Sequence, residues 1–241
     1  MGAVASLIME WLQRRPLRGF QTAAVNDKPI SCGSYSTGLL RFAVKIEEFD
    51  AHILIQNWDL VCKLLLSQLE REEVNRFVLP KDKLERLVSR LLQRYAICHA
   101  HGFSGSSSGE FQILRTSANK PYLKPEDCAP DLKNWNYSVS HQNQLVVFYS
   151  SPVSQIGIDL VQLTDDRHNV QGLSLDRWFQ RFHAKLDPEE WLHINQSAEE
   201  AGRLARFHLV WGLKEAYLKA LGTGLLLPGG PGGGGGGGLA R

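Results

Sequence analysis

The chain has 241 residues, of which 43% are hydrophobic, and it carries a formal net charge of +2. This length can hold one large domain or two small ones, and the hydrophobic share is that of an ordinary globular protein. The small net charge gives no broad basic surface for nucleic acid, and no apolar run is long enough to span a membrane. We therefore expect neither nucleic acid nor a membrane as a partner, and any anion site must be local.

The cysteines are widely spaced along the chain, at Cys32, Cys62, Cys98 and Cys128. This spacing disfavours both a zinc site and a disulfide framework. It favours a reducing compartment, so we expect a cytosolic, cytoplasmic protein.

Residues 1–40 are interpreted as an N-terminal extension. Residues 1–6 satisfy the short N-myristoylation pattern, and Arg14, Arg15 and Arg18 give a faint likeness to an organelle transit peptide. Both patterns are often met by chance, and we favour a disordered extension over either.

Helix and strand patterns alternate through the middle of the chain. Phe42, Val44 and Ile46 alternate as in a half-buried strand, and Pro80 separates two stretches with helical periodicity. The expected elements here are a strand at 42–46, a helix at 59–77, a helix after Pro80 with its apolar face at 84–95, a flexible loop at 104–109, and strands at 111–114 and 137–141.

A lone carboxylate stands in an apolar run near residue 160. A strand at 145–149 and a turn at 150–152 precede a second predicted strand, 156–161. The period of two places Asp159 on the face opposite Ile158, between Gly157 and Val161. A buried unpaired carboxylate costs several kcal/mol, so Asp159 needs a cation, a donor cluster or water, unless it lies at a solvated strand end. Gly157 leaves room for a ligand or for another backbone.

A second carboxylate lies on a predicted helix over 204–221, which should stop at Gly222. Trp211, Glu215 and Lys219 are spaced i, i+4 and i+8 and share one stripe of this helix. A solvated Glu–Lys pair is the plain alternative, but the large Trp211 favours a partly buried face. With Lys214 beside it, the stripe suits a divalent cation that holds a phosphate.

The chain resembles the 4′-phosphopantetheinyl transferases of the larger, surfactin-synthetase-activating type. Within that type it is most similar to the eukaryotic L-aminoadipate-semialdehyde dehydrogenase phosphopantetheinyl transferases. The motifs that carry the resemblance occur in order over residues 70–222: Arg76-Phe77-Val78 with Lys81-Asp82 and Ser89-Arg90-Leu91-Leu92, then Arg115-Thr116-Ser117-Ala118-Asn119-Lys120-Pro121, then Ser138-Val139-Ser140-His141, then Gly157-Ile158-Asp159, then Trp211-Gly212-Leu213-Lys214-Glu215-Ala216-Tyr217-Leu218-Lys219.

The resemblance implies an enzyme with holo-[acyl-carrier-protein] synthase activity. Such an enzyme transfers 4′-phosphopantetheine from coenzyme A to a serine of an apo acyl or peptidyl carrier protein. The reaction depends on Mg²⁺ and releases adenosine 3′,5′-bisphosphate. Lysine and fatty-acid biosynthesis are the pathways that it suggests, and a monomer is expected.

The resemblance also implies roles for single residues. Asp159 and Glu215 match the magnesium ligands, Glu215 is also the general base, and Lys219 contacts the pyrophosphate, with Lys214 in support. The nucleotide site is implied for Arg115, Lys120, Ser138, Ser140 and His141. Taken without the family, the two basic residues read as surface charges flanking a turn and the histidine as a structural strand-end residue.

A hydrolase built on neighbouring Ser140 and His141 is a third interpretation, and it is disfavoured. Adjacent strand residues point to opposite faces of a sheet, so they cannot act together as nucleophile and base.

Some positions depart from the family pattern. Glu73 stands near a position where a basic residue is expected, beside Arg71 and Arg76. Val161 takes the place of a second acid found in many bacterial members, so a water would complete the metal shell. Ser138 replaces the usual asparagine, which is a mild change.

The expected fold class is α+β, with the pseudo-twofold transferase fold and its second half truncated at the C-terminal end. Residues 41–154 would form the N-terminal half, 155–227 an incomplete C-terminal half, and 228–241 a disordered glycine-rich tail. The shortened end leaves an alternative open, an inactive relative that only binds coenzyme A or a carrier protein.

Overall fold

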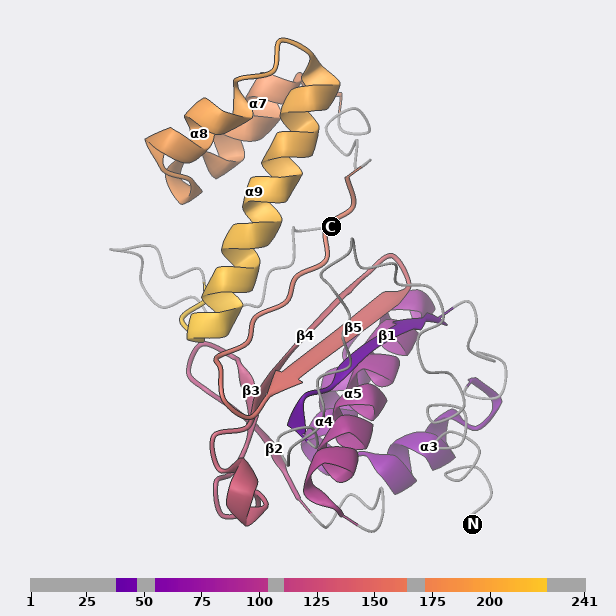
Figure 1. The fold of residues 1–241 in the computed structure, drawn as a ribbon. Helices are drawn as coiled ribbons and strands as arrows, with labels where there is room; N and C mark the ends of the chain where they lie inside the picture. Colours follow the sequence, from indigo (N-terminus) through magenta and orange to yellow (C-terminus); the bar gives the residue numbers. More distant parts are fainter. Residues whose placement is uncertain (1–37, 47–54, 104–110, 164–171, 225–241) are drawn as a thin grey trace.

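A computed structural model describes residues 38–46, 55–103, 111–163 and 172–224 (Figure 1). It contains the expected mixture of helices and sheet. In chain order the elements are β1 (Arg41–Lys45), α3 (Trp58–Leu65), α4 (Gln68–Asn75), α5 (Pro80–His101), β2 (Ile113–Arg115), β3 (Pro121–Leu123), η3 (Pro130–Leu132), β4 (Asn136–Gln142), β5 (Leu145–Ser151), α7 (Leu175–Phe179), η4 (Gln180–Lys185), α8 (Pro188–Ile194) and α9 (Glu200–Leu221).

Several predictions concern residues outside these ranges. They are the loop at 104–109, the glycine-rich tail at 228–241 and all but the last residues of the N-terminal extension. The proposed incompleteness of the second half also stays a prediction. Within the described residues, no helix is both long and apolar enough to cross a bilayer.

The first half is an antiparallel sheet in the order β1-β5-β4, with α5 packed on one face. Phe148 of β5 lies opposite Phe42 on one side and Val139 on the other. Paired residues share a face, and Tyr137 on that face donates its hydroxyl to Gln93 Oε1 of α5 at 3.3 Å. The apolar side chains of this face and of α5 therefore form one core.

The predicted helix over 59–77 is wrong in its extent, because it is interrupted at Leu66 and Ser67. Ser67 starts a new helix with a capping box: its hydroxyl accepts from the N–H of Glu70 at 3.3 Å, and Glu70 Oε2 accepts from the N–H of Ser67 at 2.9 Å. These contacts satisfy N–H groups that a helix terminus leaves free, which stabilises the break. The helix after Pro80 is confirmed as α5.

The predicted strand over 156–161 is also corrected: this stretch is extended but does not join the sheet. Its backbone N–H groups donate to side chains of β4 instead. The pairs are Ile156 N to Asn136 Oδ1 at 2.9 Å, Ile158 N to Ser138 Oγ at 3.1 Å and Leu160 N to Ser140 Oγ at 3.3 Å. Polar side chains on alternate β4 residues thus accept the hydrogen bonds that backbone carbonyls accept in a sheet. The N–H groups that donate also belong to alternate residues of the segment, as in a strand.

The second half is helical within the described residues and has its own aromatic core. Trp178, Phe179 and Phe182 pack around Phe207 and Trp211 of α9, with ring centroids of Phe207 and Trp178 5.0 Å apart. The predicted helix ending at Gly222 is confirmed as α9, which starts earlier than expected. Gly222 has a φ of 70°, the left-handed conformation of a helix C-cap. The predicted burial of Trp211 is also confirmed.

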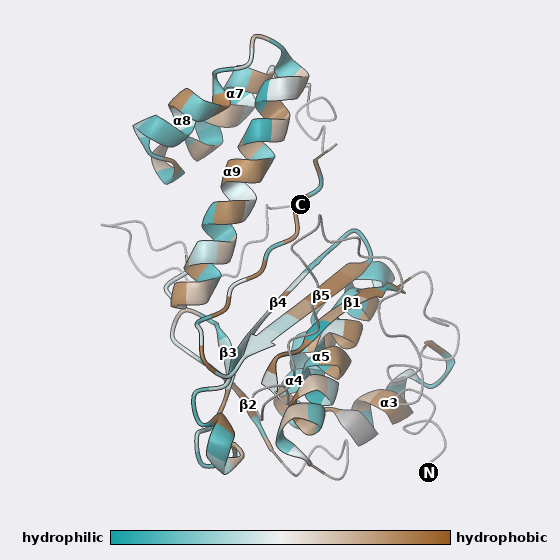
Figure 2. Ribbon diagram, viewed as in Figure 1, coloured by the Kyte–Doolittle hydropathy of each residue, from teal (hydrophilic) through white to brown (hydrophobic). Residues whose placement is uncertain are grey.

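The α9 helix leaves one apolar stripe uncovered by the described residues. Leu209, Leu213, Tyr217 and Leu221 follow at intervals of four, and Leu213 and Tyr217 are each 64% exposed. Figure 2 shows hydrophobic colour along α9 as it extends from the α7 and α8 helices towards the sheet. By contrast, α5 of the same length is buried over most of its surface.

Candidate functional site

The extended segment around Asp159 lies directly against the backbone of α9. A Cβ on Gly157 would lie 1.8 Å from the carbonyl oxygen of Ala216, and one on Gly212 would lie 3.0 Å from Val161. Of the two explanations for Gly157, room for a ligand or for another backbone, the structure gives the second. Because Gly157 and Val161 face α9, Asp159 between them faces it too.

Asp159 is held by a donor cluster. Its Oδ1 accepts from Lys219 Nζ at 2.5 Å and from Ser140 Oγ at 2.9 Å, and its side chain is 12% exposed. Lys219 also donates to Ser140 Oγ at 3.1 Å. The segment, β4 and α9 therefore each supply one member of a charged cluster.

Glu215 lies one helical turn before Lys219, and its pKa is raised above the ordinary value. Burial is the main cause, and the nearby carboxylate of Asp159 adds to it, while Lys219 and Lys185 act in the opposite direction. The two carboxylates predicted from the sequence are thus close enough to repel each other.

The electrostatics of this pair suit a hard divalent cation. A bound Mg²⁺ would relieve the repulsion between Asp159 and Glu215, and it commonly takes one or two carboxylates with phosphate oxygens and waters. A cluster of three or more His, Cys, Asp or Glu side chains is absent from the part of the chain that the structure describes.

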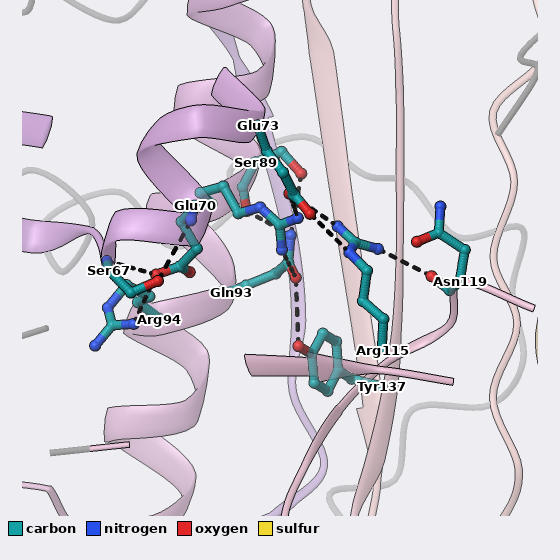
Figure 3. A network of polar contacts seen from close by, with 10 residues as sticks. Ser67, Glu70, Glu73, Ser89, Gln93, Arg94, Arg115, Asn119 and Tyr137 are labelled. Atoms are coloured by element: carbon teal, nitrogen blue, oxygen red, sulfur yellow. Dashed lines mark hydrogen bonds and ion pairs between the residues drawn. The ribbon is translucent and has the colours of Figure 1, made fainter. Parts of the chain in front are cut away.

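Arg115, predicted to contact a phosphate, is held by a carboxylate of this chain. Its Nε donates to Glu73 Oε1 at 3.1 Å and its NH2 group to Glu73 Oε2 at 3.3 Å, and NH1 donates to the carbonyl of Asn119 at 2.9 Å. Figure 3 shows Glu73 of α4 and Arg115 of β2 pointing toward each other. The residue is only 26% exposed, so it is not a plain surface charge.

Lys120 and Lys214 are each engaged elsewhere in the fold. Lys120 Nζ donates to the carbonyls of Ala220 at 2.7 Å and Ile156 at 3.3 Å, and burial lowers its pKa. It thereby joins the β2–β3 turn to the C-terminal end of α9. Lys214 pairs with Glu190 of α8 at 2.5 Å. A phosphate contact by either lysine would require it to leave these partners.

Ser138 and His141 fall on opposite sides of β4. Ser138 is buried and accepts from Ile158 N. His141 shares its face with its cross-strand partner Val146. Burial lowers the pKa of His141 to about 4, with further lowering by Arg86 and Lys219, so the imidazole is neutral near pH 7. Ser140 faces Lys219 and Asp159, so it does not form a pair with His141.

Sequence reasoning did not assign roles to the basic side chains of α5. Arg90 is buried and shares Glu73 with Arg115, while Arg94 pairs with Glu70 at 3.1 Å. The spacing of Arg86, Arg90 and Arg94 at i, i+4 and i+8 could have revealed this stripe. Burial and the neighbouring Arg90 both lower the pKa of Arg86.

Two protein-family models match this chain. The family described as 4′-phosphopantetheinyl transferase, N-terminal, matches residues 54–153. The family described as the 4′-phosphopantetheinyl transferase superfamily matches residues 155–230. The two matches follow each other along the chain and cover β4, β5 and α9, while β1 lies before the first match.

Curated proteins with similar sequences carry related names. A phosphopantetheinyl transferase from Thraustochytrium is 30% identical over 164 residues, which cover 66% of this chain and 54% of that protein. The human L-aminoadipate-semialdehyde dehydrogenase-phosphopantetheinyl transferase is 28% identical over 156 residues, 65% of this chain and 48% of that protein. Its counterpart in Schizosaccharomyces pombe is 30% identical over 163 residues, 66% of this chain and 60% of that protein. The chain spans about half the length of these relatives.

Proposed function

Since this chain belongs to the 4′-phosphopantetheinyl transferase superfamily, we propose that it transfers 4′-phosphopantetheine from coenzyme A to a serine of an apo carrier protein. The other product is adenosine 3′,5′-bisphosphate. The observation that carries the proposal is the convergence of Asp159, Glu215 and Lys219, two acids and a lysine from segments distant along the chain. Such a group suits a reaction at a pyrophosphate.

Glu215 acts as the general base in this proposal. Burial raises the pKa of Glu215 and the charge of Asp159 adds to the shift, so its carboxylate accepts a proton more readily than an ordinary glutamate, as a base for the carrier serine requires. The serine oxygen then forms a bond to the phosphorus that bears pantetheine. The bond between the two phosphates breaks, and its electron pair leaves with the nucleotide.

Lys219 and Ser140 order the charges around the reacting group. Lys219 places a positive charge where the leaving phosphate gains negative charge, which stabilises the transition state. Ser140 donates to Asp159 and accepts from Lys219, so it fixes the two side chains relative to each other.

Asp159 and Glu215 are the residues that would hold Mg²⁺. The ion would supply neutralisation of the pyrophosphate charge. The repulsion between the two carboxylates supports this assignment. A cation held by both carboxylates would bind more tightly than a cation held by one of them.

The names of the relatives suggest a first substrate to test. A carrier domain of an L-aminoadipate-semialdehyde dehydrogenase is the proposed acceptor, which fits the lysine pathway that the resemblance suggests. Acyl carrier proteins of fatty-acid synthesis are the second acceptor class to compare.

The test is the labelling of apo-carrier protein with a fluorescent coenzyme A in the presence and absence of Mg²⁺. Glu215→Gln should reduce labelling by about 10²–10⁴-fold, the usual contribution of a general base. Glu200→Gln is the matched control, because Glu200 lies on the same helix and is exposed. Full labelling by Glu215→Gln would remove this residue from the mechanism.

A binding role without transfer is the second candidate, and the exposed stripe of α9 favours it. Leu213 and Tyr217 are uncovered on the helix that carries Glu215 and Lys219, so this helix offers an apolar surface to which a carrier protein could bind whether or not transfer follows. Calorimetry that detects coenzyme A binding to a chain inactive in labelling would support this candidate over the enzyme.

A further inference from the structure

Glu73 of α4 contacts two arginines, Arg115 of β2 and the buried Arg90 of α5. Both of its carboxylate oxygens accept from Arg115, at 3.1 and 3.3 Å, and one of them also accepts from Arg90. Figure 3 shows this carboxylate between the helices and the arginine on β2. Glu73 stands near the position at which the family pattern leads us to expect a basic residue.

A carboxylate in this arrangement presents the same acceptors as a phosphate. An arginine fork binds either group through two parallel N–H···O bonds. All three guanidinium nitrogens of Arg115 are engaged, two by Glu73 and one by Asn119. A ligand phosphate could use the Nε–NH2 side of the Arg115 guanidinium, which Glu73 holds, only by displacing that carboxylate.

The charges around Glu73 make that displacement costly. Arg90 is buried, with a side chain 1% exposed, and the nearby Arg86 already has a lowered pKa because of burial and Arg90. If Glu73 moved away, Arg90 and Arg115 would lose their shared counter-charge. A dianionic phosphate would also meet the negative charge of Glu73 at close range.

Coenzyme A presents phosphate at two places, the pyrophosphate and the ribose 3′-phosphate. In the proposed function the pyrophosphate lies with Asp159, Glu215 and Lys219. Arg115 is then left for the ribose 3′-phosphate.

We propose that Glu73 is a specificity-determining residue that occupies the position of the ribose 3′-phosphate at Arg115. The chain would consequently bind a pantetheine donor without that phosphate, 3′-dephospho-coenzyme A, about as well as coenzyme A. This inference rests on the proposed function, because it takes the nucleotide to lie against Arg115.

The test measures dissociation constants of both donors by calorimetry for the full chain, with Mg²⁺ present. The wild-type chain should bind the two donors within about threefold of each other. Glu73→Gln removes the competing charge but keeps an acceptor for Arg90, so it should favour coenzyme A over 3′-dephospho-coenzyme A by about tenfold or more, as expected for one charge-assisted contact. Glu72→Gln, an exposed neighbour on α4, should change neither constant.

Glu73→Asp is a second variant, in case the glutamine variant folds poorly. Its shorter side chain keeps the negative charge but draws it away from the guanidinium of Arg115. The preference for coenzyme A over 3′-dephospho-coenzyme A should therefore increase by a smaller factor than in Glu73→Gln. Circular dichroism and Tm report whether each variant is folded.

The possible outcomes separate the two proposals. A wild-type chain that binds and transfers from coenzyme A but rejects 3′-dephospho-coenzyme A overturns the role of Glu73 and leaves the proposed function intact. The role of Glu73 is also overturned if both folded Glu73 variants have the same ratio of dissociation constants for the two donors as the wild type. Binding of neither donor by the folded wild-type chain overturns both proposals.

Discussion

Gly157 lies against the carbonyl of Ala216 so closely that a Cβ at this position would be 1.8 Å from that oxygen. The contact joins the segment that carries Asp159 to the helix that carries Glu215 and Lys219. The two backbones can approach this closely because Gly157 has no side chain. The close approach positions Asp159 opposite Lys219.

Gly157→Ala should destabilise the chain strongly, because backbone atoms of a helix cannot yield as a side chain can. We expect a loss of about 3 kcal/mol or more, beyond ordinary overpacking, measured as the free energy of unfolding in urea. Gly212→Ala is the comparison: its added Cβ meets only the side chain of Val161 at 3.0 Å, and alanine gains helix propensity. Equal stability of both variants would mean that the close approach is not essential.

Lys120→Met should loosen the junction between the β2–β3 turn and α9. The ammonium donates to Ala220 and Ile156 carbonyls, and loss of these bonds should lower the free energy of unfolding by about 1–3 kcal/mol. Lys81→Met, at an exposed position, should have little effect. A similar Tm for both variants would show that Lys120 does not hold the junction.

Glu215→Gln should raise the Tm in metal-free buffer at neutral pH. The pKa of Glu215 is raised on folding, so the folded chain binds this proton more tightly than the unfolded chain does. The associated stability is present below the ordinary value of 4.5 and is lost as pH rises through the raised pKa. The glutamine side chain does not ionise, so the variant does not lose this stability as pH rises.

The measurement for Glu215 is Tm against pH for wild type, Glu215→Gln and Glu200→Gln. Only Glu215→Gln should have a higher Tm than the wild type, and this difference in Tm should vanish below about pH 4.5. Mg²⁺ with adenosine 3′,5′-bisphosphate should stabilise the wild type, by about 2.7 kcal/mol at 100 times the dissociation constant, but not Glu215→Gln. A wild-type Tm above that of Glu215→Gln at neutral pH without metal would contradict the expected sign.

Leu213→Lys should leave the stability of the chain nearly unchanged. The side chain is 64% exposed on the α9 stripe, so its replacement should change the free energy of unfolding by no more than about 0.5 kcal/mol. Urea unfolding measures this free energy, and Leu204→Lys, at a buried position of the same helix, should unfold the protein. Strong destabilisation by Leu213→Lys would mean that another part of the chain covers the stripe.

Local patterns were enough to predict much of the fold. The strand β4, the helix after Pro80 and the end of α9 at Gly222 follow from periodicity, a proline and a left-handed glycine, all of which act over a few residues. The break at Ser67 was missed, although Ser67 and Glu70 have the spacing of a capping box and could have revealed it.

The sequence by itself determined the acids of the site and their sides: Asp159 opposite Ile158, and Glu215 in line with Lys219. Only the tertiary structure decided which partners the basic residues have, Arg115 with Glu73, Lys120 with carbonyls of α9 and Lys214 with Glu190. The reason is physical. Periodicity fixes the direction of a side chain along its own element, whereas an ion pair depends on the distance between elements that lie far apart in the chain.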